Sequence, residues 1–237
     1  MWLNNWRAIL LHPFQVKTNF LLKCGIFTIF LFCLGLYSAM LAPNDYLQGI
    51  YYKIMYVHVP SAWISMGLYV FMASISFIFI VYKIPSLALI AESSSIVGAV
   101  FTFITLVTGS IWGMPTWGTW WIWDARLTSM LVLLFIYISC IALRASFTTD
   151  FGSVITAYFS VFGLINIPII KFSVDVWNTL HQPSSFIKLS APTVHSSMIP
   201  PLLIMLVSML SMAWMCIVLL VKSKQLESKY NRWSARL

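Results

Sequence analysis

Six long apolar stretches, separated by short polar segments, run along the chain. They lie at residues 24–42, 62–82, 94–111, 127–143, 154–170 and 199–221. A helix needs roughly 20 mostly apolar residues to cross the hydrocarbon core of a bilayer, and each stretch is close to that length. The pattern therefore predicts an all-α integral membrane protein with six transmembrane helices, folded as a single domain over residues 1–237.

The composition supports a membrane location. Hydrophobic residues make up 60% of the chain and charged residues only 8%, whereas a soluble domain carries about 25% charged residues. The net charge of +8 does not indicate nucleic-acid binding, because the basic residues are scattered between the apolar stretches. The sequence has no Walker A loop, so any ATP hydrolysis is expected from a partner, and no C-x-x-C-H motif for covalent haem.

The distribution of basic residues predicts the orientation. Ten of the fourteen lysines and arginines lie in the two tails and in the segments after the second and fourth stretches. Cytoplasmic segments carry an excess of Lys and Arg, so both termini are expected in the cytoplasm. Residues 43–61, 112–126 and 171–198 then face outward. The apolar stretches contain no charge near their centres, with Glu92 just before the third, which disfavours an ion-coupled transporter.

The second outward segment is rich in tryptophan. Five of the eleven tryptophans lie between residues 112 and 123, and Asp124 and Arg126 follow directly. One explanation is an aromatic belt, because tryptophan favours the membrane interface. The other is a platform for a large flat apolar ligand, because indole faces bury much area and stack in offset geometry. Arg126 then either meets an anionic group of the ligand or pairs with Asp124.

Two histidines flank this segment on the same side of the membrane. His58 precedes Pro60, which suits the first turn of a helix, so His58 is expected in a loop just outside the second span. His181 lies in the third outward segment, and His195 lies at the start of the sixth span, where we assign it no role. Neutral imidazole is a common axial ligand of haem iron. Zinc is the alternative, but zinc sites need three or four close ligands, so the pattern favours haem.

The motif Trp-Gly-x-x-Trp-x-Trp-Asp-x-Arg-Leu-Thr at residues 117–128 resembles the tryptophan-rich WWD motif of haem-handling membrane proteins. Its continuation, together with Met-Tyr-x-His-x-Pro around His58 and Asn-Thr-Leu-His around His181, is similar to the cytochrome c maturation protein C family (CcmC, haem exporter protein C). The resemblance covers nearly the whole chain, and the six spans and the outward WWD segment agree with it.

The resemblance implies that His58 and His181 are the axial ligands of a transiently bound haem b. The residues expected to hold the macrocycle are Trp112, Trp117, Gly118, Trp120, Trp121, Trp123, Asp124 and Arg126. It also implies a non-enzymatic assembly factor for c-type cytochromes, in the bacterial inner membrane or the mitochondrial inner membrane. The expected partners are a CcmE-like periplasmic haem chaperone, a small CcmD-like membrane protein and a CcmA/CcmB-like ABC transporter.

Two alternatives from other classes remain open. One is a haem-b electron-transfer subunit, which usually takes its iron ligands from rigid helices inside the membrane. The other is a pore that carries haem across from the cytoplasm, although the uncharged spans offer no obvious path for the propionates. Ligands on two separate loops favour a carrier, because a small loop motion would let the haem leave.

Overall fold

The computed structural model describes residues 17–147, 150–177, 179–181 and 195–234, and these residues fold into helices and short connections. The α-helices are α2 (Thr18–Leu41), α3 (Met55–Tyr82), α4 (Pro85–Trp117), α5 (Ala125–Ser146), α6 (Asp150–Phe162), α7 (Asn166–Val176) and α8 (Ile199–Ser234). Three short 3-10 turns are η2 (Tyr51–Ile54), η3 (Gly163–Ile165) and η4 (Ser196–Met198). Six segments of the described chain are long and apolar enough to cross a membrane, which confirms the predicted fold class and number of spans.

The helices extend beyond the predicted spans. The second begins at Met55 rather than near residue 62, and the third runs from Pro85 to Trp117. Pro60 is therefore the sixth residue of α3 instead of lying in its first turn. The 3-10 turn η2 leads directly into α3, so the helix is already established when the chain reaches the proline. The prediction missed these turns because hydropathy locates the hydrocarbon core, not the ends of the helices.

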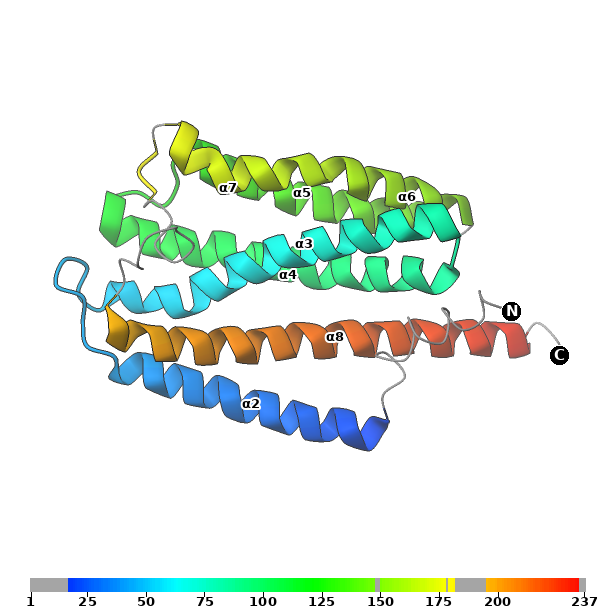
Figure 1. Cartoon of the computed structure of the whole chain (residues 1–237), viewed down its shortest axis with the longest axis horizontal. Helices are drawn as coiled ribbons and strands as arrows, with labels where there is room; N and C mark the ends of the chain where they lie inside the picture. Colours follow the sequence, from blue (N-terminus) through cyan, green and yellow to red (C-terminus); the bar gives the residue numbers. More distant parts are fainter. Residues whose placement is uncertain (1–16, 148–149, 178, 182–194, 235–237) are drawn as a thin grey trace.

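The central helices α3 and α4 are joined by a turn of two residues. Lys83 ends α3 in the left-handed conformation, and Pro85 occupies the first position of α4, which suits its fixed φ and missing N–H. The pair α2 and α8 lies along one side of these helices, and α5, α6 and α7 lie along the other (Figure 1). Residues 42–54 and 118–124 and the start of α8 all lie at one end of the molecule.

Two buried tyrosines connect the central helices to their neighbours. The Tyr69 hydroxyl donates to the Ser160 carbonyl at 2.8 Å, and the Tyr137 hydroxyl donates to the Ser65 carbonyl at 2.8 Å. Their rings meet edge to face, with centroids 5.2 Å apart. A Cβ on Gly163 would lie 2.2 Å from the Tyr69 hydroxyl, so glycine is required here. This glycine opens the 3-10 turn that separates α6 from α7 within one span.

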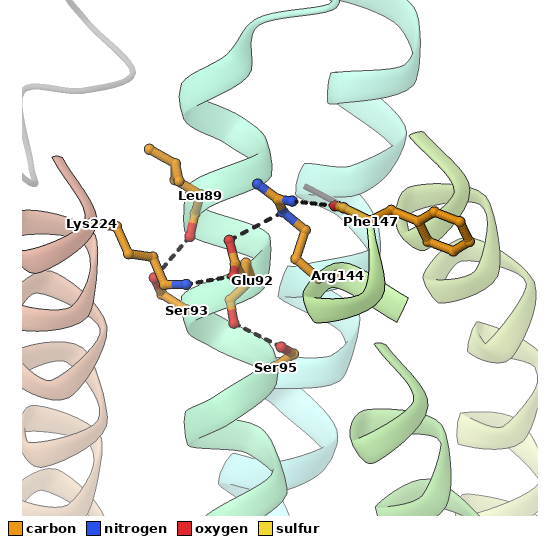
Figure 2. A network of polar contacts seen from close by, with 7 residues as sticks. All are labelled: Leu89, Glu92, Ser93, Ser95, Arg144, Phe147 and Lys224. Atoms are coloured by element: carbon orange, nitrogen blue, oxygen red, sulfur yellow. Dashed lines mark hydrogen bonds and ion pairs between the residues drawn. The ribbon is translucent and has the colours of Figure 1, made fainter. Parts of the chain in front are cut away.

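An ion cluster joins α4, α5 and α8 at the end of the molecule opposite residues 118–124 (Figure 2). Glu92, expected just before a span, instead lies on α4. Its carboxylate accepts a hydrogen bond from Lys224 on α8 and lies 3.4 Å from Nε of Arg144 on α5. Arg144 also donates to the Phe147 carbonyl at 3.0 Å. One carboxylate thus pairs with a cation from each of two neighbouring helices.

The Glu92→Gln variant is expected to lower the thermal stability of the protein. It leaves two partly buried cations without their counter-ion; removing one partner of a fully buried pair costs roughly 3–5 kcal/mol, and partial exposure reduces this to about 1–3 kcal/mol. Thermal unfolding of the purified protein in detergent measures the change. Glu227→Gln, at an exposed position on α8, is the matched control. Equal unfolding temperatures for the two variants would contradict a stabilising role for the cluster.

Candidate functional site

A cavity of about 740 Å³ lies at the end of the helical bundle where α4 ends and α5 begins. Its walls come from residues 43–48, the start of α3, the end of α4, the start of α5 and residues near the start of α8. Apolar side chains make up most of the lining, and the volume falls within the roughly 300–1,000 Å³ of typical ligand pockets.

Most of the predicted site residues line this cavity. They are His58, Trp112, Trp117, Trp121, Arg126 and His181. Trp120 and Trp123 lie outside the lining and are largely exposed, at 58% and 76%. Trp123 meets Trp121 edge to face, with ring centroids 5.5 Å apart. Gly118 and Asp124 also lie outside the lining. Gly118 ends α4, and Asp124 caps the start of α5. The five tryptophans therefore do not form one continuous platform.

The predicted loop over residues 112–126 is much shorter in the structure. Helix α4 continues through Trp112 to Trp117 and ends where Gly118 adopts a left-handed φ of 75°, which glycine tolerates without strain. Helix α5 begins directly after Asp124, whose Oδ1 accepts a hydrogen bond from the Leu127 N–H at 2.8 Å. Two of the five tryptophans are thus held on a helix, which fixes their positions better than a loop would.

His58 lies on α3, so its predicted position in a loop is wrong. Its Nδ1 is 3.1 Å from the Thr108 hydroxyl on α4, and its ring meets Trp112 edge to face at 5.8 Å. A Cβ on Gly109 would lie 3.0 Å from Cε1 of this imidazole. A larger residue at position 109 would therefore crowd the ring, so glycine lets α4 approach His58 closely.

The first outward loop is attached to the same wall of the cavity. The Trp112 indole N–H donates to the Gln48 side-chain carbonyl at 2.8 Å. Gln48 follows a turn in which the Asp45 carboxylate accepts from the N–H groups of Leu47 and Gln48 at 2.9 and 2.8 Å. The Trp112–Gln48 contact, like the His58–Thr108 contact, joins residues far apart in the sequence. Nothing in the local sequence around Gln48 or Thr108 indicated a role for either residue.

His181 also lines the cavity and is connected to Asp124 through Thr179. The Thr179 hydroxyl donates to Oδ2 of Asp124, and the His181 N–H donates to Oγ1 of Thr179 at 3.0 Å. Nη1 of Arg126 lies 3.3 Å from Nδ1 of His181, and the Trp117 ring lies 6.0 Å from its imidazole. Asp124 therefore starts α5 and positions the His181 segment at the same time.

The structure does not support a pair between Arg126 and Asp124. Within the described ranges, the ion pairs closer than 4.0 Å are those of Glu92. Nε of Arg126 and the indole N–H of Trp121 are both buried without a hydrogen-bond partner among the described residues. Both side chains line the cavity, so a ligand with an oxygen acceptor would satisfy donors that the described part of the protein leaves unpaired.

His195 also lines the cavity but is exposed and engaged locally. Its Nδ1 accepts a hydrogen bond from the Ser197 N–H at 3.3 Å, which caps the turn η4 before α8. The predicted start of the sixth span is therefore confirmed at this position. Across the described ranges, no three His, Cys, Asp or Glu side chains gather closely enough to hold a metal ion by themselves.

The fold and the site together define a six-span membrane protein with a tryptophan- and histidine-lined cavity at one end of its helical bundle. The sequence model of the family "Heme exporter protein C" (CcmC) matches residues 11–236, and the chain belongs to this family. Its members handle haem in cytochrome c biogenesis. The predicted resemblance is confirmed over nearly the whole chain.

Relatives occur in bacteria and in mitochondria. The chain is 46% identical over 183 residues to "Putative cytochrome c biosynthesis ccmC-like mitochondrial protein" of Marchantia polymorpha, covering 77% of this chain and 78% of the relative. It is 45% identical over 182 residues to "Heme exporter protein C" of Bradyrhizobium diazoefficiens (76% and 69% covered). It is 38% identical over 218 residues to the protein of the same name in Haemophilus influenzae (88% and 89% covered). The protein is therefore a multi-pass protein of the inner membrane, as predicted.

Proposed function

We propose that the cavity binds one haem b between His58 and His181 and that the protein delivers this haem to a CcmE-like periplasmic chaperone. The observation that carries the proposal is that the imidazoles of His58 and His181, from different parts of the chain, line one mostly apolar cavity together with four indoles.

The residues present fit a porphyrin better than a bare metal ion. A porphyrin supplies four ligands to its iron and leaves two axial positions, which is the number of ligands that His58 and His181 provide. Trp112, Trp117 and Trp121 provide aromatic surface for the macrocycle. The unpaired donors of Trp121 and Arg126 suit the carboxylates at its edge.

Delivery requires that the haem can leave, and the two candidate ligands differ in how they are held. His58 is part of a helix, whereas His181 lies beyond the end of α7 and is attached through Thr179 and Arg126. We therefore assign the release step to the His181 segment. The distribution of basic residues along the chain supports an outward-facing cavity, because the basic ends of the helices lie at the opposite end of the molecule.

The proposal assigns no catalytic step to this chain. The CcmE-like chaperone captures the haem, and a CcmA/CcmB-like ABC transporter with a small CcmD-like protein supplies the ATP-dependent step. Titration of haemin into the purified protein tests the binding site, and mixing with the soluble domain of the chaperone tests delivery. We expect saturation at one haem per chain with a low-spin b-type spectrum, followed by transfer. Failure to bind haem would contradict the proposal.

One observation favours a second candidate, the haem-b electron-transfer subunit. His58 lies on a membrane-spanning helix, as the ligands of permanent b-type cytochromes usually do. The two functions differ in the fate of the haem. A reversible redox midpoint with no transfer to the chaperone would favour electron transfer, whereas transfer to the chaperone would favour delivery.

A further inference from the structure

The two candidate iron ligands have opposite hydrogen-bond environments. The Thr108 hydroxyl donates its one hydrogen to the Ile104 carbonyl at 2.7 Å, so it accepts from Nδ1 of His58. The neutral imidazole of His58 therefore carries its hydrogen on Nδ1, which leaves the lone pair of Nε2 available. This is the arrangement typical of a metal-binding histidine whose other ring nitrogen donates to a neighbouring oxygen.

His181 is arranged the other way round. A guanidinium group has only donors, so Nη1 of Arg126 donates to Nδ1 of His181. The neutral imidazole of His181 then carries its hydrogen on Nε2, and its lone pair on Nδ1 is engaged by Arg126. Because iron binds imidazole through a lone pair, Arg126 and iron compete for the same electrons of His181.

The positive charge of Arg126 is not paired with a carboxylate of the described residues. Among the described residues no carboxylate lies within 4.0 Å of its guanidinium, and its Nε is buried without a hydrogen-bond partner. The nearest acidic side chain in sequence, Asp124, is engaged by the Leu127 N–H and the Thr179 hydroxyl. A carboxylate is a stronger acceptor for a guanidinium than a neutral imidazole is. An acidic group in the cavity would therefore draw Arg126 away from His181.

We propose that Arg126 is a positioning residue that engages His181 until a carboxylate of the porphyrin takes over its guanidinium. This inference rests on the proposed function. His58 is then the first iron ligand, and His181 becomes the second only when the porphyrin carries a free acidic group. The step forms an iron–nitrogen bond and exchanges one hydrogen bond for another. No proton has to leave the site, because the neutral imidazole offers a lone pair as soon as Arg126 withdraws.

Haem and its dimethyl ester separate the two states, because the ester has the same iron and ring but no carboxylates. We expect wild-type protein to bind ferric haem in a low-spin form with two histidine ligands and the ester in a high-spin form with one. Arg126→Met removes the competing donor, so this variant should bind both compounds in the low-spin form. Optical and electron paramagnetic resonance spectra report the spin state in detergent, with empty micelles as the blank.

Affinities provide a second readout. Wild-type protein is expected to bind haem about 10-fold more tightly than the ester, the size of one hydrogen bond to a charged group, whereas Arg126→Met should bind the two compounds about equally. Lys171→Met is the matched control, because Lys171 is another cation lining the cavity and does not contact His181 in the described contacts. It should keep the high-spin form with the ester.

Several results would overturn the inference. They are a low-spin ester complex of wild-type protein, a high-spin haem complex of Arg126→Met, and no ester binding to that variant. In these cases His58→Ala and His181→Ala would still alter the haem spectrum, so the proposed function would stand. If neither alanine variant changes the spectrum of bound haem, or if wild-type protein binds neither compound, the proposed function itself fails and this inference fails with it.

Discussion

Replacing His58 by alanine is expected to remove the low-spin haem spectrum of the purified protein and to abolish haem loading of the chaperone. His58 is held by Thr108 and Trp112 with its Nε2 lone pair available, so its removal takes away a ligand that is already positioned for the iron. Haem affinity should fall by at least about 10–100-fold, since losing even an outer partner of a metal ligand costs that much. His181→Ala should give a high-spin haem that still binds through His58.

His195→Ala is the matched control for both variants. This histidine lines the same cavity, but its Nδ1 is engaged in capping the turn before α8. Its removal should leave the spin state and the affinity for haem unchanged. The measurements are haem titration of each purified variant and the haem content as a pyridine complex. A low-spin spectrum that survives both His58→Ala and His181→Ala would show that the iron ligands lie elsewhere.

The membrane architecture could be predicted because it depends on a strong local signal. A run of apolar side chains long enough to cross a bilayer is visible in the sequence without knowledge of any contact. The ends of the helices were less predictable. Pro115 was expected in a loop and Pro60 in the first turn of a helix, yet each lies further inside a helix. Helices in membranes tolerate proline when neighbouring elements satisfy the freed backbone groups, and this depends on packing rather than on local sequence.

The candidate site was predictable as a set of residue types but not as an arrangement. The cluster of tryptophans and the two histidines lie at the end of the molecule that holds the cavity, and both histidines line it. The partners Gln48, Thr108 and Thr179 were missed, since each acts through a contact with a residue at least 50 positions away. Such pairs arise only when the helices pack, so no spacing along the chain reveals them.

Replacing Asp124 is expected to have the second large effect, because its carboxylate accepts two separate hydrogen bonds. Its Oδ1 caps the N-terminus of α5, and its Oδ2 accepts from the Thr179 hydroxyl that in turn holds the His181 backbone. Asp124→Ala removes both interactions. We expect a loss of about 0.5–2 kcal/mol from the cap alone, and a lower thermal unfolding temperature together with loss of the low-spin haem form. Unfolding in detergent and haem titration measure the two effects.

Asp124→Asn separates the two tasks. The amide oxygen of asparagine still caps α5, so the unfolding temperature should stay near that of the wild type. The amide nitrogen cannot accept from Thr179 and can only donate to its hydroxyl oxygen, so the contact loses its charged acceptor, the His181 segment should be held less firmly and the haem should shift towards the high-spin form. Asp175→Asn, at an exposed position near the end of α7, controls for the loss of one negative charge. A low-spin, tightly bound haem in Asp124→Asn would mean that Asp124 serves the helix alone and that His181 is positioned by Arg126 and Trp117.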